Sequence, residues 1–145
     1  MKRTKIRLKS ISTTAQIKDD IQNLVREIVM LRDKGCILRK TRHCGGEIGK
    51  VVIQADHLIT RANSATYADT RLIVCLCRSC HGWKHWNEKE YDEMVKQILP
   101  KDRVELWDKC EKDRHAHKTY KMDWAMEKVA LERELKSLST DLVDK

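Results

Sequence analysis

The sequence predicts a mostly helical α+β protein with a compact strand–strand–helix (ββα) unit at its centre and helices on both sides. The chain has 145 residues with only one proline and five glycines, a composition typical of a helix-rich globular protein of about one domain. Two short β-prone runs occur over 51–55 and 72–76, separated by a polar stretch, and a helical pattern follows from Cys80 onward. This order defines the predicted central unit.

The segment before the central unit is predicted to be an amphipathic helix. Thr13 followed three residues later by Gln16 has the spacing of a capping box, which marks a helix start. Gly35 stands where a left-handed residue would end the helix. The apolar residues of its buried face recur at helical spacing: Ile17, Ile21, Leu24, Val25, Ile28 and Val29.

Three further helices are expected after the central unit. The first covers 87–99, with Asn87 at its start and Pro100 just beyond its end. The second covers 102–113, and the last begins at Trp124, after a polar break. These helices carry no residues that suggest chemistry, so they are expected to support the fold or to bind a partner.

The net charge of +8 lies wholly within residues 1–50, because the rest of the chain has equal numbers of basic and acidic residues. A localised positive excess favours a polyanionic partner, most often nucleic acid, although a solubilising tail is the alternative. No apolar run is long enough for a membrane span or a signal peptide, so we expect a cytoplasmic protein with no membrane partner. The excess begins with five residues: Lys2, Arg3, Lys5, Arg7 and Lys9.

The six cysteines indicate a metal site. Without a secretion signal, so many cysteines favour metal binding or catalysis over disulfides. Cys77 and Cys80 have the two-residue spacing of a zinc knuckle, and Cys36 and Cys44 form a looser pair. Four thiolates on one Zn²⁺ would tie the end of the first helix to the ββα unit. The remaining two are expected to be buried thiols: Cys75 and Cys110.

A second set of metal ligands is predicted next to the zinc knuckle. Asp56 and His57 end the first strand, and His81 directly follows the second knuckle cysteine. Asp56 and His81 offer an oxygen and a nitrogen to a divalent ion, which leaves His57 free as a general base. His85 lies four residues after His81 on the same helical face, as a third candidate ligand or else a surface histidine.

Together these residues resemble an HNH endonuclease, in particular the zinc-containing phage HNH proteins and phage recombination endonucleases. The resemblance covers roughly residues 35–86. It implies a ββα-metal fold in which His57 deprotonates a water that attacks a DNA phosphodiester. It also implies that Asp56 and His81 hold Mg²⁺, Mn²⁺, Ni²⁺ or Zn²⁺. The matching residues are Cys36, Cys44, Ala55-Asp56-His57, Arg61-Ala62-Asn63-Ser64-Ala65-Thr66, Asp69 and Cys77-Arg78-Ser79-Cys80-His81.

The resemblance also implies how the chain is organised. It predicts a basic arm over 1–12, a zinc-stabilised nuclease domain over 13–99 and a C-terminal helical extension over 100–145. DNA is the implied partner, in the host cytoplasm if the chain is phage-encoded, and the last helix is a candidate contact for a second copy or another phage protein. Three basic residues flank the expected site, as phosphate contacts or as plain surface charge: Arg61, Arg78 and Lys84.

One position departs from the family pattern. The family's middle Asn stands five residues before the first knuckle cysteine, where this chain has Leu72. A leucine cannot make the hydrogen bonds by which that Asn holds the catalytic loop. The departure is expected to weaken the activity, and it supports the alternative of a zinc-stabilised DNA-binding module without cleavage. A structural zinc protein that binds a partner through its last helix is a third hypothesis.

Overall fold

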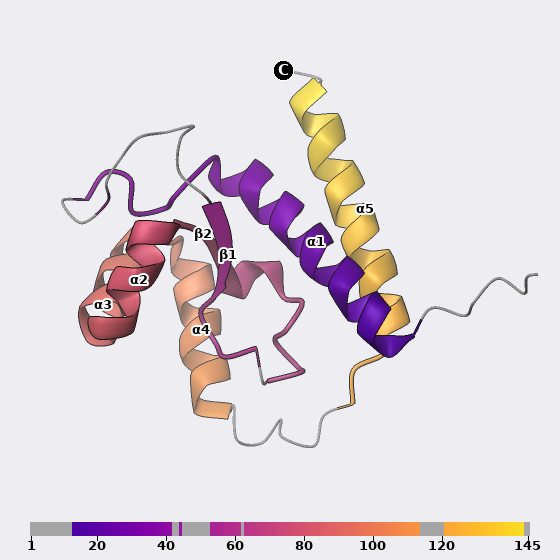
Figure 1. Cartoon of the computed structure of the whole chain (residues 1–145), viewed down its shortest axis with the longest axis horizontal. Coiled ribbons are helices and arrows are strands. Elements are labelled where there is room, and N and C mark those ends of the chain that lie inside the picture. The colour runs from indigo at the N-terminus through magenta and orange to yellow at the C-terminus, as the bar shows by residue number, and fades with distance from the viewer. Residues whose placement is uncertain (1–12, 42–43, 45–52, 62, 114–120, 144–145) are drawn as a thin grey trace, which may run out of the picture.

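The computed structural model describes residues 13–41, 44, 53–61, 63–113 and 121–143 (Figure 1). The predicted basic arm, the start of the first β-prone run and the polar break at 114–120 lie outside the described residues. The described elements are α1 (Thr14–Asp33), β1 (Ile53–His57), the short 3₁₀ helix η1 (Thr70–Leu72), β2 (Ile73–Cys77), α2 (Arg78–Trp86), α3 (Glu88–Ile98), α4 (Lys101–Asp113) and α5 (Trp124–Val143). The expected α+β class, mostly helical, is confirmed.

The two strands form an antiparallel sheet between two groups of helices. Figure 1 shows α1 and α5 on one side of the strands and α2, α3 and α4 on the other. Every residue of β2 is buried, because successive side chains point to opposite faces and both faces are covered. Ile73 and Cys75 pack with α1 and α5, whereas Val74 and Leu76 pack with the other helices. The sheet therefore separates two hydrophobic cores.

Helix α1 begins as predicted and ends one residue earlier than expected. The Thr13 hydroxyl accepts a hydrogen bond from the Gln16 amide at 3.2 Å, which confirms the cap. The left-handed residue is Lys34, with φ 58°, and Gly35 follows with φ 135°. Two positive φ values in a row turn the chain sharply, and the second is one that L side chains rarely adopt, which explains the glycine.

The first strand ends two residues later, and the second one residue later, than the runs at 51–55 and 72–76 that predicted them. Ile53 pairs with Cys77, and His57 pairs with Ile73. Leu72, predicted to begin the second strand, instead ends η1. Helix α2 starts at Arg78, two residues before the predicted Cys80. The shift places Asp56 and His57 inside the sheet, where cross-strand pairing fixes their backbone.

The remaining helices follow their predicted ranges closely. Asn87 precedes α3 as expected, but its side chain donates to the Trp83 carbonyl at 3.0 Å and so caps the end of α2. Helix α5 lies beside α1, with Leu131 buried against it and an ion pair of 3.1 Å between Lys128 and Asp20. Within the described residues, no helix combines the length and apolar character needed to cross a bilayer.

Candidate functional site

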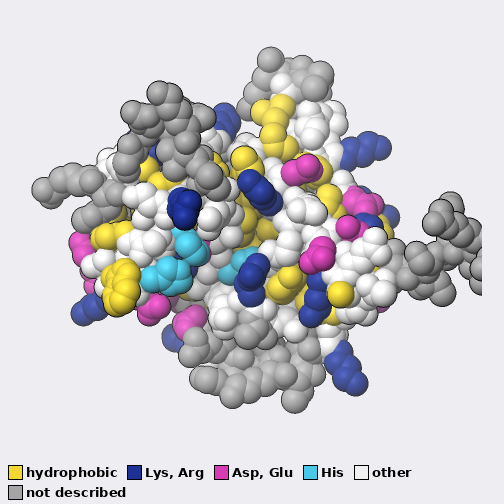
Figure 2. Space-filling model, viewed as in Figure 1, with side chains coloured by type: hydrophobic (Ala, Val, Ile, Leu, Met, Phe, Trp, Pro, Cys, Tyr) yellow, Lys and Arg dark blue, Asp and Glu magenta, His cyan; other side chains and the backbone are white. Residues whose placement is uncertain are grey.

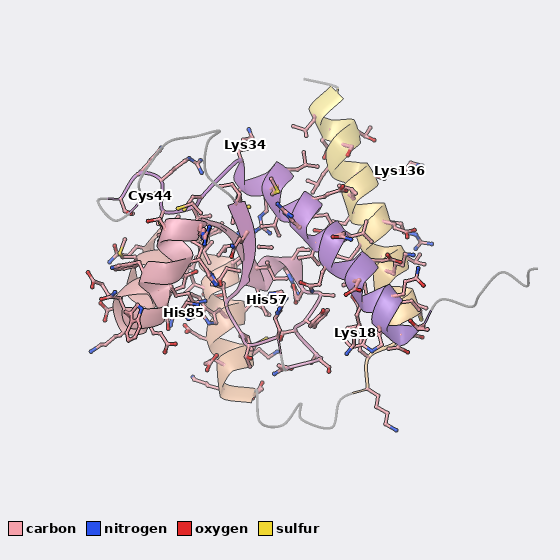
Figure 3. The ribbon with its side chains drawn as sticks, viewed as in Figure 1. Lys18, Lys34, Cys44, His57, His85 and Lys136 are labelled. Atoms are coloured by element: carbon pink, nitrogen blue, oxygen red, sulfur yellow. The ribbon has the colours of Figure 1, made fainter. Side chains whose placement is uncertain are left out.

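The four predicted zinc ligands lie together. The sulfurs of Cys36, Cys44, Cys77 and Cys80 all fall within 4.8 Å of one another. The Sγ atoms of Cys44 and Cys77 are 3.9 Å apart, close to the roughly 3.8 Å separation of two thiolates bound tetrahedrally at about 2.3 Å from Zn²⁺. The cluster could therefore hold a metal ion such as zinc. Figure 3 shows Cys44 facing the start of α2.

Local backbone structure brings the cysteines together. Cys77 is the last residue of β2 and the N-cap of α2, and its sulfur accepts a hydrogen bond from the Cys80 amide at 3.4 Å. Cys36 follows the sharp turn after α1, and the next residue, Ile37, donates its amide to the Cys75 carbonyl at 3.0 Å. The cluster thus joins the end of α1 to β2 and α2, as the sequence predicted.

Cys36, Cys77 and Cys80 have shifted pKa values. Burial raises the pKa of Cys36 to about 11 and also raises that of Cys80. Burial alone would raise the pKa of Cys77 as well, but hydrogen bonds from the Cys80 amide and the neighbouring thiols outweigh it and leave that pKa lowered. Compared with Cys36 and Cys80, Cys77 therefore favours the thiolate, the form that binds a metal.

The two remaining cysteines lie outside the cluster. Cys75 is fully buried, which confirms the predicted buried thiol, and burial raises its pKa to about 12. Cys110 is half-buried and packs against the core on the α4 side. Neither sulfur belongs to the four that could share an ion.

Asp56 is the centre of the second predicted site. It is only 5% exposed, and three side chains from α2 and α3 surround its carboxylate. The Lys84 ammonium lies 2.6 Å from Oδ2, and the Tyr91 hydroxyl donates to the same oxygen at 3.1 Å. His81 Nδ1 lies 3.2 Å from the other oxygen, Oδ1. One carboxylate oxygen is thus held by protein donors, and the other faces a histidine.

Oδ1 of Asp56 and Nδ1 of His81 are placed as two ligand atoms of one ion could be. His81 Nδ1 is buried and makes no hydrogen bond, in spite of its short distance to Oδ1. A buried ring nitrogen without a partner is costly. Two neighbouring ligands of an octahedral ion bound at about 2.1 Å lie about 3 Å apart, so Asp56 Oδ1 and His81 Nδ1 fit adjacent positions around a divalent cation.

His85 does not join this pair in the structure. Its Nε2 lies 3.3 Å from Nε2 of His81, with the rings edge to face. His81 therefore faces Asp56 with one nitrogen and His85 with the other. Within the described part of the chain, the four cysteines form the only set of three or more such side chains that converges on one point. The predicted common helical face is present, while a three-ligand site is not formed.

His57 lies at the end of β1, where the chain leaves the sheet (Figure 3). Its Nε2 is 2.9 Å from the Tyr67 carbonyl oxygen. A carbonyl can only accept a hydrogen bond, so Nε2 carries the proton and the neutral ring keeps its lone pair on Nδ1. Burial lowers the pKa of His57 below its ordinary value, and the charges of Arg61 and Lys84 lower it further, against the hydrogen bond to Tyr67 and the charge of Asp56. The ring is therefore neutral at pH 7.

The three residues predicted to contact phosphate differ in their exposure and in their partners. Arg61 and Arg78 are exposed, whereas the Lys84 ammonium is bound to Asp56. Figure 2 shows the histidine side chains on the surface, with Lys and Arg on either side of them. The five basic residues predicted in the arm (Lys2, Arg3, Lys5, Arg7 and Lys9) lie outside the described residues.

Two residues of the site were not predicted. Tyr91 lies within the helix predicted over 87–99, and its hydroxyl contact with Asp56 joins residues 35 positions apart. Tyr67 acts through its backbone carbonyl, which any residue would supply, so no sequence signal marks it. A buried tyrosine needs a hydrogen-bond partner, and this was the one available hint toward Tyr91.

Comparisons with family models, curated proteins and solved structures gave no match to this chain.

Proposed function

We propose that this protein is a metal-dependent endonuclease of the HNH type that hydrolyses DNA phosphodiester bonds. The single observation that carries the proposal is that the neutral His57 directly follows Asp56 at the end of β1, and that Oδ1 of Asp56 faces His81 Nδ1. A neutral histidine with its proton fixed on Nε2 stands one residue from a carboxylate whose free oxygen faces an unpartnered ring nitrogen. A base beside a metal position is what metal-assisted hydrolysis requires.

The residues have distinct parts in this reaction. His57 Nδ1 takes a proton from a water as the water oxygen bonds to phosphorus and the bond from phosphorus to the 3′ oxygen breaks. Asp56 Oδ1 and His81 Nδ1 would hold the divalent ion, which when bound stabilises negative charge on the phosphate and the departing oxygen. The Tyr67 carbonyl keeps the His57 ring in its base-competent tautomer.

The surrounding contacts support these roles. Tyr91 and Lys84 both bind Oδ2 of Asp56, so they orient the carboxylate and leave Oδ1 toward His81. Arg61 is exposed and close enough to His57 to lower its pKa, which places a cation where a phosphate would approach. The positive excess in residues 1–50 favours binding of a polyanion such as DNA.

Zinc has a separate, structural part in the proposal. Four thiolates leave no open position for water on a tetrahedral ion, so the cysteine cluster would stabilise the fold. The cluster fixes Cys77 and Cys80 at the start of α2, the helix that carries His81 and Lys84. Zinc binding would thereby set the position of one half of the catalytic site.

A zinc-stabilised DNA-binding module without cleavage is the second candidate. Leu72 favours it, because its side chain is 1% exposed in the apolar core and offers no polar group to the loop that follows His57. This candidate keeps the zinc cluster and the basic arm but assigns no role to the neutral, oriented His57.

A plasmid-cleavage assay separates the two candidates. Purified protein is incubated with supercoiled DNA and EDTA, Mg²⁺, Mn²⁺ or Ni²⁺, alongside His57→Ala prepared in the same way. We expect metal-dependent nicking that falls at least about 100-fold in the variant, while zinc content, melting temperature and DNA affinity stay unchanged. Equal cutting by both proteins would remove the role of His57, and DNA binding without cutting would favour the binding module.

A further inference from the structure

The segment that follows His57 leaves the sheet and returns at η1. Residues 58–69 form this excursion, and the returning chain pairs again when Ile73 meets His57 across the strands. The Leu58 amide donates to the Leu72 carbonyl at 2.9 Å, which closes the base of the loop. The side chain of Leu72 lies in the core, so this residue holds the loop through its backbone alone.

Two arginines from distant helices bind the returning end of this loop. Arg32, in the last turn of α1, donates to the Thr70 carbonyl and to the Ile73 carbonyl, both at 2.6 Å. Arg103, near the start of α4, donates to the Arg71 carbonyl at 2.8 Å and to the Ile73 carbonyl at 3.2 Å. The Leu58 amide donates to the Leu72 carbonyl. Each backbone carbonyl of residues 70–73 therefore accepts a hydrogen bond from a residue outside 70–73.

The two guanidinium groups are themselves costly to place here. Arg32 is held by Asp33, at 2.7 Å, and Asp33 also accepts the Cys75 amide at 3.0 Å. Arg103 makes no ion pair with a described carboxylate, and burial together with the charge of Arg32 lowers its pKa. Bringing two cations to one carbonyl is unfavourable, and the adjacent Asp33 offsets part of this cost for Arg32.

The geometry that they fix is that of His57. The His57 backbone pairs with Ile73, whose carbonyl both arginines bind, and its ring is oriented by the Tyr67 carbonyl from within the same loop. A shift of the loop's returning end would move both supports at once. A guanidinium fork can bind two carbonyls at fixed separation, which a lysine ammonium cannot reproduce.

We propose that Arg32 and Arg103 are positioning residues for His57, acting through the backbone of residues 70–73. The proposal rests on the proposed function for its catalytic consequence, while its structural consequence can be measured without activity. Arg32 on α1 and Arg103 on α4 make hydrogen bonds to the loop backbone that the side chain of Leu72 cannot make.

The test compares Arg103→Lys and Arg103→Ala with a matched control, Arg26→Ala. Arg26 lies on α1, as Arg32 does, and like Arg103 it donates to a backbone carbonyl of the sheet. That carbonyl is the one of Ile53, at the opposite end of β1 and at 3.4 Å. We expect both Arg103 variants to lose kcat by about 100-fold, the effect of a displacement near 1 Å, with KM, zinc content and melting temperature nearly unchanged. The control is expected to cut as the wild type does.

Two readouts do not depend on cleavage. Amide hydrogen exchange at Leu58 is expected to accelerate at least about tenfold in both Arg103 variants, and ¹⁵N imidazole shifts are expected to show loss of the single Nε2-protonated tautomer of His57. Wild-type exchange and tautomer in Arg103→Ala would overturn the proposal, as would full kcat in that variant or an equal loss in Arg26→Ala. A wild-type protein that cuts no DNA would instead remove the proposed function, and the exchange and tautomer data would still decide the positioning role.

Discussion

The two candidate metal sites of this protein lie on neighbouring elements but are built in opposite ways. The four cysteine sulfurs already lie within 4.8 Å of one another, and a backbone turn and a helix cap fix three of the cysteines: Cys36, Cys77 and Cys80. The Asp56–His81 pair has two facing ligand atoms, while His85 points to the other side of the His81 ring. One set brings four ligand atoms together, whereas the other brings only two.

This difference matches what the two kinds of metal site need. A structural ion is best enclosed, because each position filled by protein adds to folding energy. A catalytic ion needs open positions, so few protein ligands and a fixed orientation are preferable. In this chain, protein donors hold one oxygen of Asp56 and leave the other free.

Removing a ligand of the four-cysteine cluster should have the largest effect. Cys77→Ser is expected to release zinc and unfold the protein, since structural zinc supplies about 10 to 16 kcal/mol in small zinc domains. Zinc content and thermal unfolding by circular dichroism measure this. The matched control is Cys110→Ser, which removes a thiol outside the cluster and should keep both values. Full zinc content and an unchanged melting temperature in Cys77→Ser would contradict a structural zinc site.

Removing Asp56, the centre of the Asp56–His81 site, should lower stability as well as activity. Asp56→Ala leaves the Lys84 ammonium and the Tyr91 hydroxyl without their partner, and we expect a loss of about 3 kcal/mol in the free energy of unfolding. Asp56→Asn keeps an oxygen acceptor for Tyr91 and should lose less stability. Urea denaturation gives both values. Equal stability of Asp56→Ala and the wild type would show that these contacts contribute nothing.

The two histidines of α2 should differ in importance. His81→Ala removes a ligand atom that faces Asp56 and is expected to lower the cleavage rate by at least about 100-fold. His85→Ala removes a neighbour of that ligand and is expected to cost about tenfold, the lower end of effects of groups that support a ligand. Cleavage rates across a Mn²⁺ titration compare them. A larger loss in His85→Ala would make His85 the ligand and change the site's geometry.

The smallest expected effect is on the pH dependence of cleavage. The base must be unprotonated, and burial lowers the pKa of His57 from its ordinary 6.5. As pH falls, activity should therefore persist below pH 6.5 and be lost only as the lowered pKa is crossed. The same shift means that the unfolded chain binds a proton first, so His57 also reduces stability as pH falls below 6.5. A profile of kcat/KM with its acidic midpoint above 6.5 would contradict the neutral, buried base.

Local sequence signals predicted the elements well where a single segment carries the cause. Thr13 and Gln16 mark the start of α1, and Pro100 marks the end of α3, because caps and proline act within a few residues. The strands were displaced because their ends depend on which residue pairs across the sheet, as Ile53 does with Cys77. Asn87 flanks α3 as predicted, but its side chain serves α2 instead.

Long-range contacts of the candidate site could not be predicted in this way. Residue spacing predicted that the four cysteines share one site and that His81 and His85 share one helical face. The structure places the members of each group close together. The contact of Lys84 with Asp56 links residues 28 positions apart, and that of Arg32 with Ile73 links residues 41 apart. Lysine and arginine on a helix give no local sign of such partners, since most lie in water.

The packing of α5 on α1 has a consequence for synthesis of the chain. Lys128 and Asp20, which form an ion pair between these helices, are 108 residues apart, so α1 leaves the ribosome long before α5 exists. Until then, the core shared by Ile21, Val25 and Ile28 lacks Leu131. The cysteine cluster closes earlier, because it is complete once Cys80 has emerged. We therefore expect assembly to proceed outward from the half that carries the cysteine cluster, and a nascent chain that stalls before α5 would present an apolar surface to chaperones or to other nascent chains.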